Sequence, residues 1–186
     1  MNRIAVFASG SGTNAENIAL YFKDKPDVDI VCILTNNAEA FVIKRAEKLD
    51  IPTLVFSKKD FKESDKVMDY LKEMKVDFVV LAGFLWLVPK YLIQMYPNRI
   101  VNIHPALLPK YGGKGMYGMN VHEAVVENEE DESGITIHMV SENYDEGKVV
   151  FQARCFVKAS DTAEDVATKV HKLEYEHFPK IIEQLL

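Results

Sequence analysis

The sequence lacks the positive charge that nucleic-acid-binding proteins use. Its 22 Lys and Arg residues are outnumbered by 28 Asp and Glu residues, which gives a formal net charge of −6. Proteins that bind DNA or RNA carry a basic patch or stripe that pairs with the phosphate backbone. We therefore expect no nucleic acid as the main ligand, although a local basic pocket is compatible with this charge.

Cysteine is scarce as well. The sequence contains only Cys32 and Cys155, far apart and each inside an apolar run. Two such cysteines make neither a disulfide framework nor a metal site, and they are typical of buried, reduced thiols in a cytoplasmic protein. We expect a cytoplasmic protein with no disulfide and no bound metal.

Long apolar segments are also missing. No apolar run approaches the ~20 residues that span a bilayer, and no apolar signal segment precedes the first expected strand, which starts at residue 4. Internal repeats and low-complexity linkers are absent. The 186 residues suit one substantial core. We expect a single domain over residues 1–186 that does not associate with membranes.

Short apolar runs alternate with segments of helical spacing. Strands are expected at 4–8, 28–35, 52–56, 78–82 and 100–104, and helices at 15–22, 40–49, 61–74 and 89–95. This alternation predicts a mostly parallel sheet with helices on both faces. Further on we expect a helix at 121–126, strands at 134–140 and 149–157, and a closing helix from 162 to about 186.

The last two expected strands differ from the others. They are joined by a loop of about eight residues with no crossover helix, and such a short connection favours antiparallel pairing. The predicted fold is therefore α/β, with a Rossmann-like open sheet that is mostly parallel and carries an antiparallel C-terminal strand pair.

The most informative segment is Asn102-Ile103-His104-Pro105, at the end of an apolar strand. Side chains at positions i and i+2 of a strand share a face, so Asn102 and His104 point the same way, and Pro105 stops the strand. An amide donor beside an imidazole can stabilise a developing oxyanion and manage a proton. The alternative is a strand end whose polar side chains only satisfy nearby backbone groups.

A glycine-rich segment, Gly10-Ser11-Gly12-Thr13-Asn14, lies where the first expected strand leads into the first expected helix. Glycines let the backbone approach an anion closely, and N–H groups at a helix N-terminus favour negative charge. The spacing of Gly10, Gly12 and Ala15 also fits a relaxed dinucleotide pattern, which requires an acid after the second strand. Residues 34–37 contain no acid. We predict a phosphate site and no NAD, with a ligand-free tight turn as the alternative.

Two further features are weaker. Leu85-Trp86-Leu87-Val88 follows the expected strand 78–82, at the sheet edge where open α/β folds bind ligands, and could line a slot for a flat heterocycle. A plain connection to the next helix is the alternative. Asp145 lies in the turn after the strand that holds His138. A carboxylate favours a charged imidazole nearby, but from the residues alone a solvated turn aspartate is the preferred interpretation.

These residues together resemble the phosphoribosylglycinamide formyltransferases of the folate-dependent formyltransferase superfamily. The resemblance covers the whole chain and is most specific at Asn102-Ile103-His104-Pro105 with Leu107-Leu108-Pro109. It implies transfer of a formyl group from 10-formyltetrahydrofolate, as co-substrate, to the glycinamide amine of 5′-phosphoribosylglycinamide in purine biosynthesis. The amine would attack the formyl carbon directly, without a covalent enzyme intermediate.

The resemblance also implies roles for individual residues. Asn102 and protonated His104 would hold the tetrahedral oxyanion, while Asp145 would keep His104 charged and support proton transfer. The implied substrate-binding residues are Gly12, Thr13, Asn14, Ala15, Glu16 and Glu174. The implied folate-binding residues are Lys58, Leu85, Trp86, Leu87, Val88 and Asn102. Lys58 stands where many relatives have an arginine, and the loop 112–118 is richer in glycine than is usual.

Other functions share the same Asn-x-His-Pro core. A formyltetrahydrofolate hydrolase would pass the formyl group to water. A non-catalytic folate- or nucleotide-binding module would keep the glycine loop but would not need Asn102, His104 and Asp145 together. Sugar-nucleotide formyltransferases use the core too, whereas a methionyl-tRNA formyltransferase would need a further domain and a basic surface. We expect small-molecule substrates and a monomer or homodimer.

Overall fold

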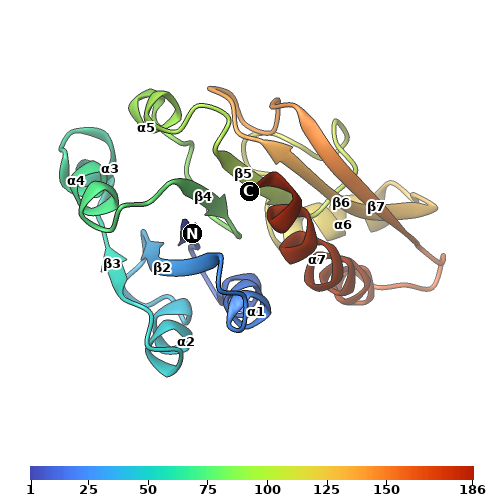
Figure 1. Cartoon of the computed structure of the whole chain (residues 1–186). Coiled ribbons are helices and arrows are strands. Elements are labelled where there is room, and N and C mark those ends of the chain that lie inside the picture. The colour runs from blue at the N-terminus through green and yellow to red at the C-terminus, as the bar shows by residue number, and fades with distance from the viewer. The chain divides into compact units, whose positions relative to one another are not determined.

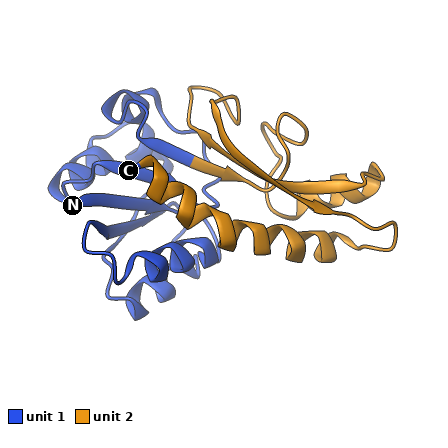
Figure 2. Cartoon of the chain, turned by 45° about the vertical axis from the view of Figure 1, so that its right-hand side comes forward, with its two compact units in different colours: residues 1–101, 186 blue, residues 102–185 orange.

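The computed structural model describes all residues, Met1–Leu186. By its internal contacts the chain divides into two compact units, residues 1–101 with Leu186 and residues 102–185, which are coloured separately in Figure 2. We call them unit 1 and unit 2 and describe each by itself. One domain over the whole chain stays a prediction.

The seven strands follow the order β3-β2-β1-β4-β5-β6-β7 (Figure 1). Their bounds are β1 Asn2–Phe7, β2 Val28–Thr35, β3 Thr53–Val55, β4 Phe78–Leu81, β5 Ile100–His104, β6 Glu132–Met139 and β7 Val149–Phe156. β1 pairs parallel with β2 and β4, β2 pairs parallel with β3, and β6 pairs antiparallel with β7. The predicted α/β sheet, mostly parallel with an antiparallel C-terminal pair, is confirmed.

Unit 1 is built on apolar strands that are buried on both faces. Every residue of β4 is buried, as are the last four of β1, which is how strands of a covered parallel sheet read in sequence. Its helices are α1 Thr13–Phe22, α2 Val42–Lys48, α3 Lys58–Lys62, α4 Lys66–Glu73 and α5 Lys90–Met95. The sheet therefore carries the glycine-rich segment between β1 and α1, as the sequence predicts.

The prediction of one helix over 61–74 was wrong, because α3 and α4 divide this stretch. The Ser57 hydroxyl accepts from the N–H of Asp60, whose carboxylate accepts from the N–H of Ser57. This capping box starts a helix before Phe61. The Ser64 hydroxyl then donates to the Asp60 carbonyl and accepts from the N–H of Lys66, so the chain turns before the apolar spacing resumes.

Unit 2 contains the end of β5, α6 (Met119–Glu127), β6, β7 and α7 (Ala163–Leu185). α7 packs against α6 and both strands. Thr162 caps this helix, since its hydroxyl accepts from the N–H of Asp165 and its own N–H donates to the Asp165 carboxylate. The helix continues through Pro179. No helix in the structure is both long and apolar enough to cross a membrane.

Candidate active site

The carboxyl end of β5 presents Asn102 and His104 side by side. β5 has the bounds that the sequence predicts, and its apolar residues Val101 and Ile103 are buried. The His104 side chain is also inside, with 4% of its residue surface exposed, whereas Asn102 is half-buried. Because strand side chains alternate between faces, the two polar groups project in one direction.

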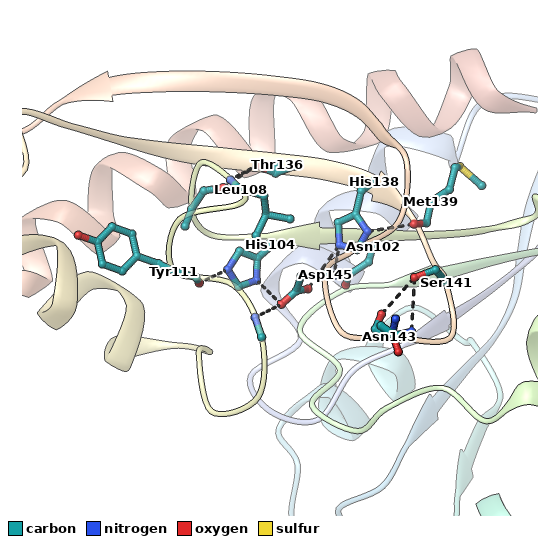
Figure 3. A network of polar contacts seen from close by, with 12 residues as sticks. Asn102, His104, Leu108, Tyr111, Thr136, His138, Met139, Ser141, Asn143 and Asp145 are labelled. Carbon is teal, nitrogen blue, oxygen red and sulfur yellow. Dashed lines mark hydrogen bonds and ion pairs between the residues drawn. The ribbon is translucent and has the colours of Figure 1, made fainter.

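Asp145 meets both histidines of this site. Its Oδ2 lies 3.6 Å from Nδ1 of His104, and its Oδ1 lies 3.5 Å from Nε2 of His138 on β6 (Figure 3). The prediction that Asp145 lies within reach of His104 is confirmed. Asp145 itself has a φ of 55°, a left-handed conformation that is uncommon outside glycine and tolerated better by aspartate than by most residues.

Backbone contacts fix this turn. The N–H of Gly113 donates to Oδ2 of Asp145 over 2.9 Å. Two residues beyond Asp145, a Cβ on Gly147 would lie 1.6 Å from the carbonyl oxygen of Met139. Only glycine allows the chain to pass so close to β6, so the turn is held against the strand that carries His138.

The His104 imidazole forms a hydrogen bond through Nε2. Nε2 lies 2.7 Å from the carbonyl oxygen of Tyr111, and since a carbonyl only accepts, Nε2 carries the hydrogen. Nδ1 faces Asp145 at 3.6 Å, which is longer than a hydrogen bond. In the neutral ring Nδ1 therefore keeps its lone pair and is free to exchange a proton.

Burial sets the charge of His104. It lowers the pKa of the imidazole, whereas Asp145 and the Tyr111 carbonyl raise that pKa by less, so the net direction is downward. Asp145 thus acts on the pKa of His104 in the expected direction, but burial has the larger effect. His104 is neutral in the resting site at neutral pH.

Asp145 is held in the ionised form. Burial works to raise the pKa of this carboxyl, but its interactions with His138, His104 and the Gly113 N–H together lower it by more. The site therefore contains an anion next to a neutral base. Protonation of His104 would place a cation beside that anion, which eases a step that makes an imidazolium.

His138 orients Asn102. Nδ1 of His138 lies 3.0 Å from the carbonyl oxygen of Met139 and so carries the hydrogen, which leaves Nε2 as an acceptor 2.9 Å from the Asn102 amide nitrogen (Figure 3). An amide nitrogen has two hydrogens. With one directed at His138, the other is available to an oxyanion.

The implied phosphate site lies in unit 1, at the start of α1. Gly12 has a φ of 72°, and a Cβ on it would lie 2.3 Å from Cγ2 of Val42, so this position requires glycine. Arg45 of α2 donates through Nε to the Ser11 carbonyl over 2.9 Å and forms an ion pair with Glu16. The loop backbone is thereby held from the α2 side.

The other residues of this expected site lie around the same turn. Thr13 and Asn14 are half-buried. Ala15 is fully buried, which leaves its backbone as the part that could meet a ligand. Glu16 is occupied by Arg45, which neutralises an acid that would otherwise repel a phosphate.

The implied folate residues other than Asn102 also lie in unit 1. Lys58 is exposed in α3. Leu85 is 41% exposed and Val88 is buried. The N–H of Leu85 donates to the Ser9 hydroxyl over 3.0 Å.

Trp86 is half-buried, and its ring contacts the rings of Phe56, Phe61 and Phe84. Residues 85–88 thus combine exposed and anchored apolar side chains.

Glu174 lies in α7, in unit 2, and is not the surface residue that a helical glutamate usually is. It is 4% exposed, and its Oε2 accepts from Nδ1 of His171 over 2.8 Å. A buried carboxylate needs such a partner. His171 in turn stacks on Tyr175, so Glu174 belongs to a polar cluster on the face of α7.

Sequence reasoning missed three contributors to the site. The Tyr111 carbonyl and the Gly113 N–H are backbone groups, and the residue type does not show which backbone groups contact the site. The pairing of His138 with Asn102 depends on β6 lying beside β5. The alternation in the β6 segment was the one available signal, because it puts His138 on a definite face.

An amide and an imidazole side by side at a strand end, with an adjacent carboxylate, form an arrangement suited to acyl transfer. The sequence matches the Formyl transferase family over residues 2–182. The chain belongs to this family, as the resemblance predicted.

Two relatives and one solved structure illustrate the similarity. The chain is 36% identical to "Phosphoribosylglycinamide formyltransferase" of Haemophilus influenzae, over 98% of this chain and 86% of that protein. It is 43% identical to the chloroplastic "Phosphoribosylglycinamide formyltransferase" of Arabidopsis thaliana, over 97% of this chain. The solved "glycinamide ribonucleotide transformylase 1" of Geobacillus kaustophilus has a TM-score of 0.90, with 33% identity and coverage of 100% and 99% of the two chains.

The lengths differ among these relatives. The chain spans 64% and 60% of the length of the Arabidopsis thaliana and Vigna unguiculata proteins, but 95% of the Bacillus subtilis protein.

Proposed function

We propose that the protein transfers the formyl group of 10-formyltetrahydrofolate to the glycinamide amine of 5′-phosphoribosylglycinamide, a step of purine biosynthesis. Membership of the formyl transferase family and the bacterial relatives support the reaction and the acceptor. The observation that carries the proposal is the meeting of Asn102, His104 and Asp145 in one polar network, which also includes His138.

The chemistry starts with direct attack by the amine nitrogen on the formyl carbon. The free N–H of Asn102 stabilises the oxyanion that forms. The attacking amine loses a proton to Nδ1 of His104, whose positive charge is then balanced by Asp145. The imidazolium supports the oxyanion and returns a proton to the folate nitrogen as its bond to the formyl carbon breaks, which releases tetrahydrofolate and the formylated amine.

This account keeps protonated His104 as the oxyanion partner but makes protonation a step of the reaction. A resting imidazolium would be costly, because burial lowers the pKa of His104. A neutral base with an adjacent carboxylate can accept the proton when the amine becomes acidic in the tetrahedral intermediate.

We assign each part of the two substrates to the residues that the family resemblance implies. We assign the phosphate of the acceptor to Gly12, Thr13, Asn14, Ala15 and Glu16, and its ribose hydroxyls to Glu174. The pterin and the folate tail are assigned to residues 85–88, Asn102 and Lys58. We further propose that the enzyme acts in the cytoplasm on small molecules alone, as a monomer or homodimer.

The direct test follows folate absorbance during turnover of 10-formyltetrahydrofolate, with and without phosphoribosylglycinamide. Formation of tetrahydrofolate that requires the glycinamide supports the transferase. Turnover that ignores the glycinamide points to the hydrolase. Folate binding without turnover, unchanged in His104→Ala, points to a binding module.

A further inference from the structure

A short backbone segment, Tyr111 to Gly113, contacts both members of the His104–Asp145 pair. The Tyr111 carbonyl lies 2.7 Å from Nε2 of His104, and the Gly113 N–H lies 2.9 Å from Oδ2 of Asp145. Small displacements of this segment would therefore change which nitrogen of His104 holds the hydrogen. The position of this segment therefore affects the protonation of His104 directly.

The segment is not held in place by its own conformational preference. Tyr111 has a φ of 56°, a conformation that costs energy for a bulky residue and persists only when its surroundings enforce it. A Cβ on Gly112 would lie 2.6 Å from Cδ2 of Leu108, so the backbone is pressed against the turn that follows His104. Something must anchor Tyr111 from outside the segment.

Glu130, in the turn between α6 and β6, supplies that anchor. Its Oε1 accepts from the Tyr111 hydroxyl over 2.9 Å, and its two oxygens accept from Nζ of Lys110 over 2.8 and 2.9 Å. The Glu130 side chain is 21% exposed, whereas that of Lys110 is 65% exposed. The more sheltered contact of Glu130 is thus the one to Tyr111, and it fixes the ring whose backbone carbonyl meets His104.

We propose that Glu130 is a positioning residue that acts through Tyr111 to hold His104 as its Nε2–H tautomer. The Tyr111 hydroxyl is the link, because it ties the carboxylate to the residue whose carbonyl accepts from Nε2. The consequence is that Nδ1 keeps its lone pair, which the proposed reaction needs as the proton acceptor. The tautomer itself is a property of the protein alone, whereas its use in catalysis rests on the proposed function.

The test reads the tautomer directly, by ¹⁵N NMR of the imidazole side chains of the full-length protein near neutral pH. The variants are Tyr111→Phe, which removes one hydroxyl, and Glu130→Ala. Glu132→Ala is the matched control, since Glu132 pairs with Arg154 on the same hairpin and has no hydrogen bond to the segment. Thermal unfolding establishes that each variant is folded.

We expect His104 to show a protonated Nε2 and an unprotonated Nδ1 in the wild type and in Glu132→Ala. In Tyr111→Phe and Glu130→Ala the two nitrogens should move toward intermediate shifts, as both tautomers become populated. Formyl transfer should lose about tenfold in kcat with little change in KM, roughly the effect of one hydrogen bond. The double variant should be no worse than either single variant, because both changes break one link.

Unaltered His104 nitrogen shifts in folded Tyr111→Phe and Glu130→Ala proteins would overturn the proposal, even if activity fell. Effects in Glu132→Ala as large as those in Glu130→Ala would also overturn it, because they would show a general electrostatic influence of the hairpin. If the wild type catalysed no formyl transfer, the proposed function would fail, while the tautomer measurement would still decide the role of Glu130.

Discussion

At the scale of single residues, one carboxylate serves two imidazoles that have different tasks. Asp145 faces the lone-pair nitrogen of His104 and the nitrogen of His138 that accepts from Asn102. His104 is neutral because burial lowers the pKa of its imidazole. Asp145 is ionised because its interactions with His138, His104 and the Gly113 N–H lower the pKa of its carboxyl by more than burial raises it. The charge in the resting site is therefore negative.

Asp145→Asn tests the need for that charge. Asparagine keeps the size and can still accept from Gly113, but it cannot balance an imidazolium on His104. We expect kcat to fall by roughly 10²–10⁴, with small changes in KM. Glu146→Gln is the matched control, an exposed neighbouring acid that accepts from Asn143. Equal losses in both variants would contradict the assignment.

At this scale the sequence predicts side chains better than backbone. The i and i+2 spacing was enough to place Asn102 and His104 on one face. It gave no access to the Tyr111 carbonyl or the Gly113 N–H, since every residue carries such groups. The position of Asp145 came from the family resemblance, because no local pattern distinguishes it from a solvated turn residue.

At the scale of elements, strands were easier to predict than helices. Strand bounds follow from apolar runs, and those of β2 and β5 were predicted to the residue. Helix bounds follow less well. The break between α3 and α4 depends on side-chain hydrogen bonds of Ser57 and Ser64, which compete locally with an otherwise helical apolar spacing.

Gly12→Ala tests the turn before α1. Its Cβ would collide with Val42, and its φ of 72° disfavours any side chain. We expect the KM for phosphoribosylglycinamide to rise about tenfold or more, with a smaller effect on the KM for the folate, if the loop binds the phosphate. Gly10→Ala is the control, since a Cβ there meets nothing within 4 Å. A rise limited to the folate KM would argue against a phosphate loop.

His122 in α6 makes the stability of the protein depend on pH. It is 2% exposed, and its pKa is lowered from 6.5 to about 4, chiefly by burial and also by the nearby His171 and His104, while Glu174 acts in the opposite sense. Since the folded pKa lies below the unfolded one, the unfolded state binds more protons between pH 6.5 and about 4. This contribution to stability is full above that window and is lost as pH falls through it.

We expect His122 alone to account for roughly 3 kcal/mol of the stability lost between pH 7 and pH 4. His122→Gln cannot titrate, so its free energy of unfolding should fall less steeply over this range. Urea unfolding at several pH values measures both slopes. Parallel slopes in the wild type and the variant would contradict the prediction.

At the scale of the whole molecule, the two units divide the proposed work. Unit 1 carries the glycine loop and the aromatic segment, and unit 2 carries Asn102, His104, Asp145 and Glu174. The sheet class was predictable, because alternating strands and helices admit few other arrangements. The strand order β3-β2-β1-β4-β5-β6-β7 was not, since a periodic pattern defines the elements and leaves their neighbours open.

The measurement that tests the central claim most directly is formyl transfer from 10-formyltetrahydrofolate to phosphoribosylglycinamide by the wild type, Asn102→Ala and His104→Ala. We expect turnover that requires the glycinamide and that drops by roughly 10²–10³ when the Asn102 amide is removed, with at least as large a loss for His104→Ala. Turnover that persists in both variants, or that proceeds at full rate without the glycinamide, would contradict the account.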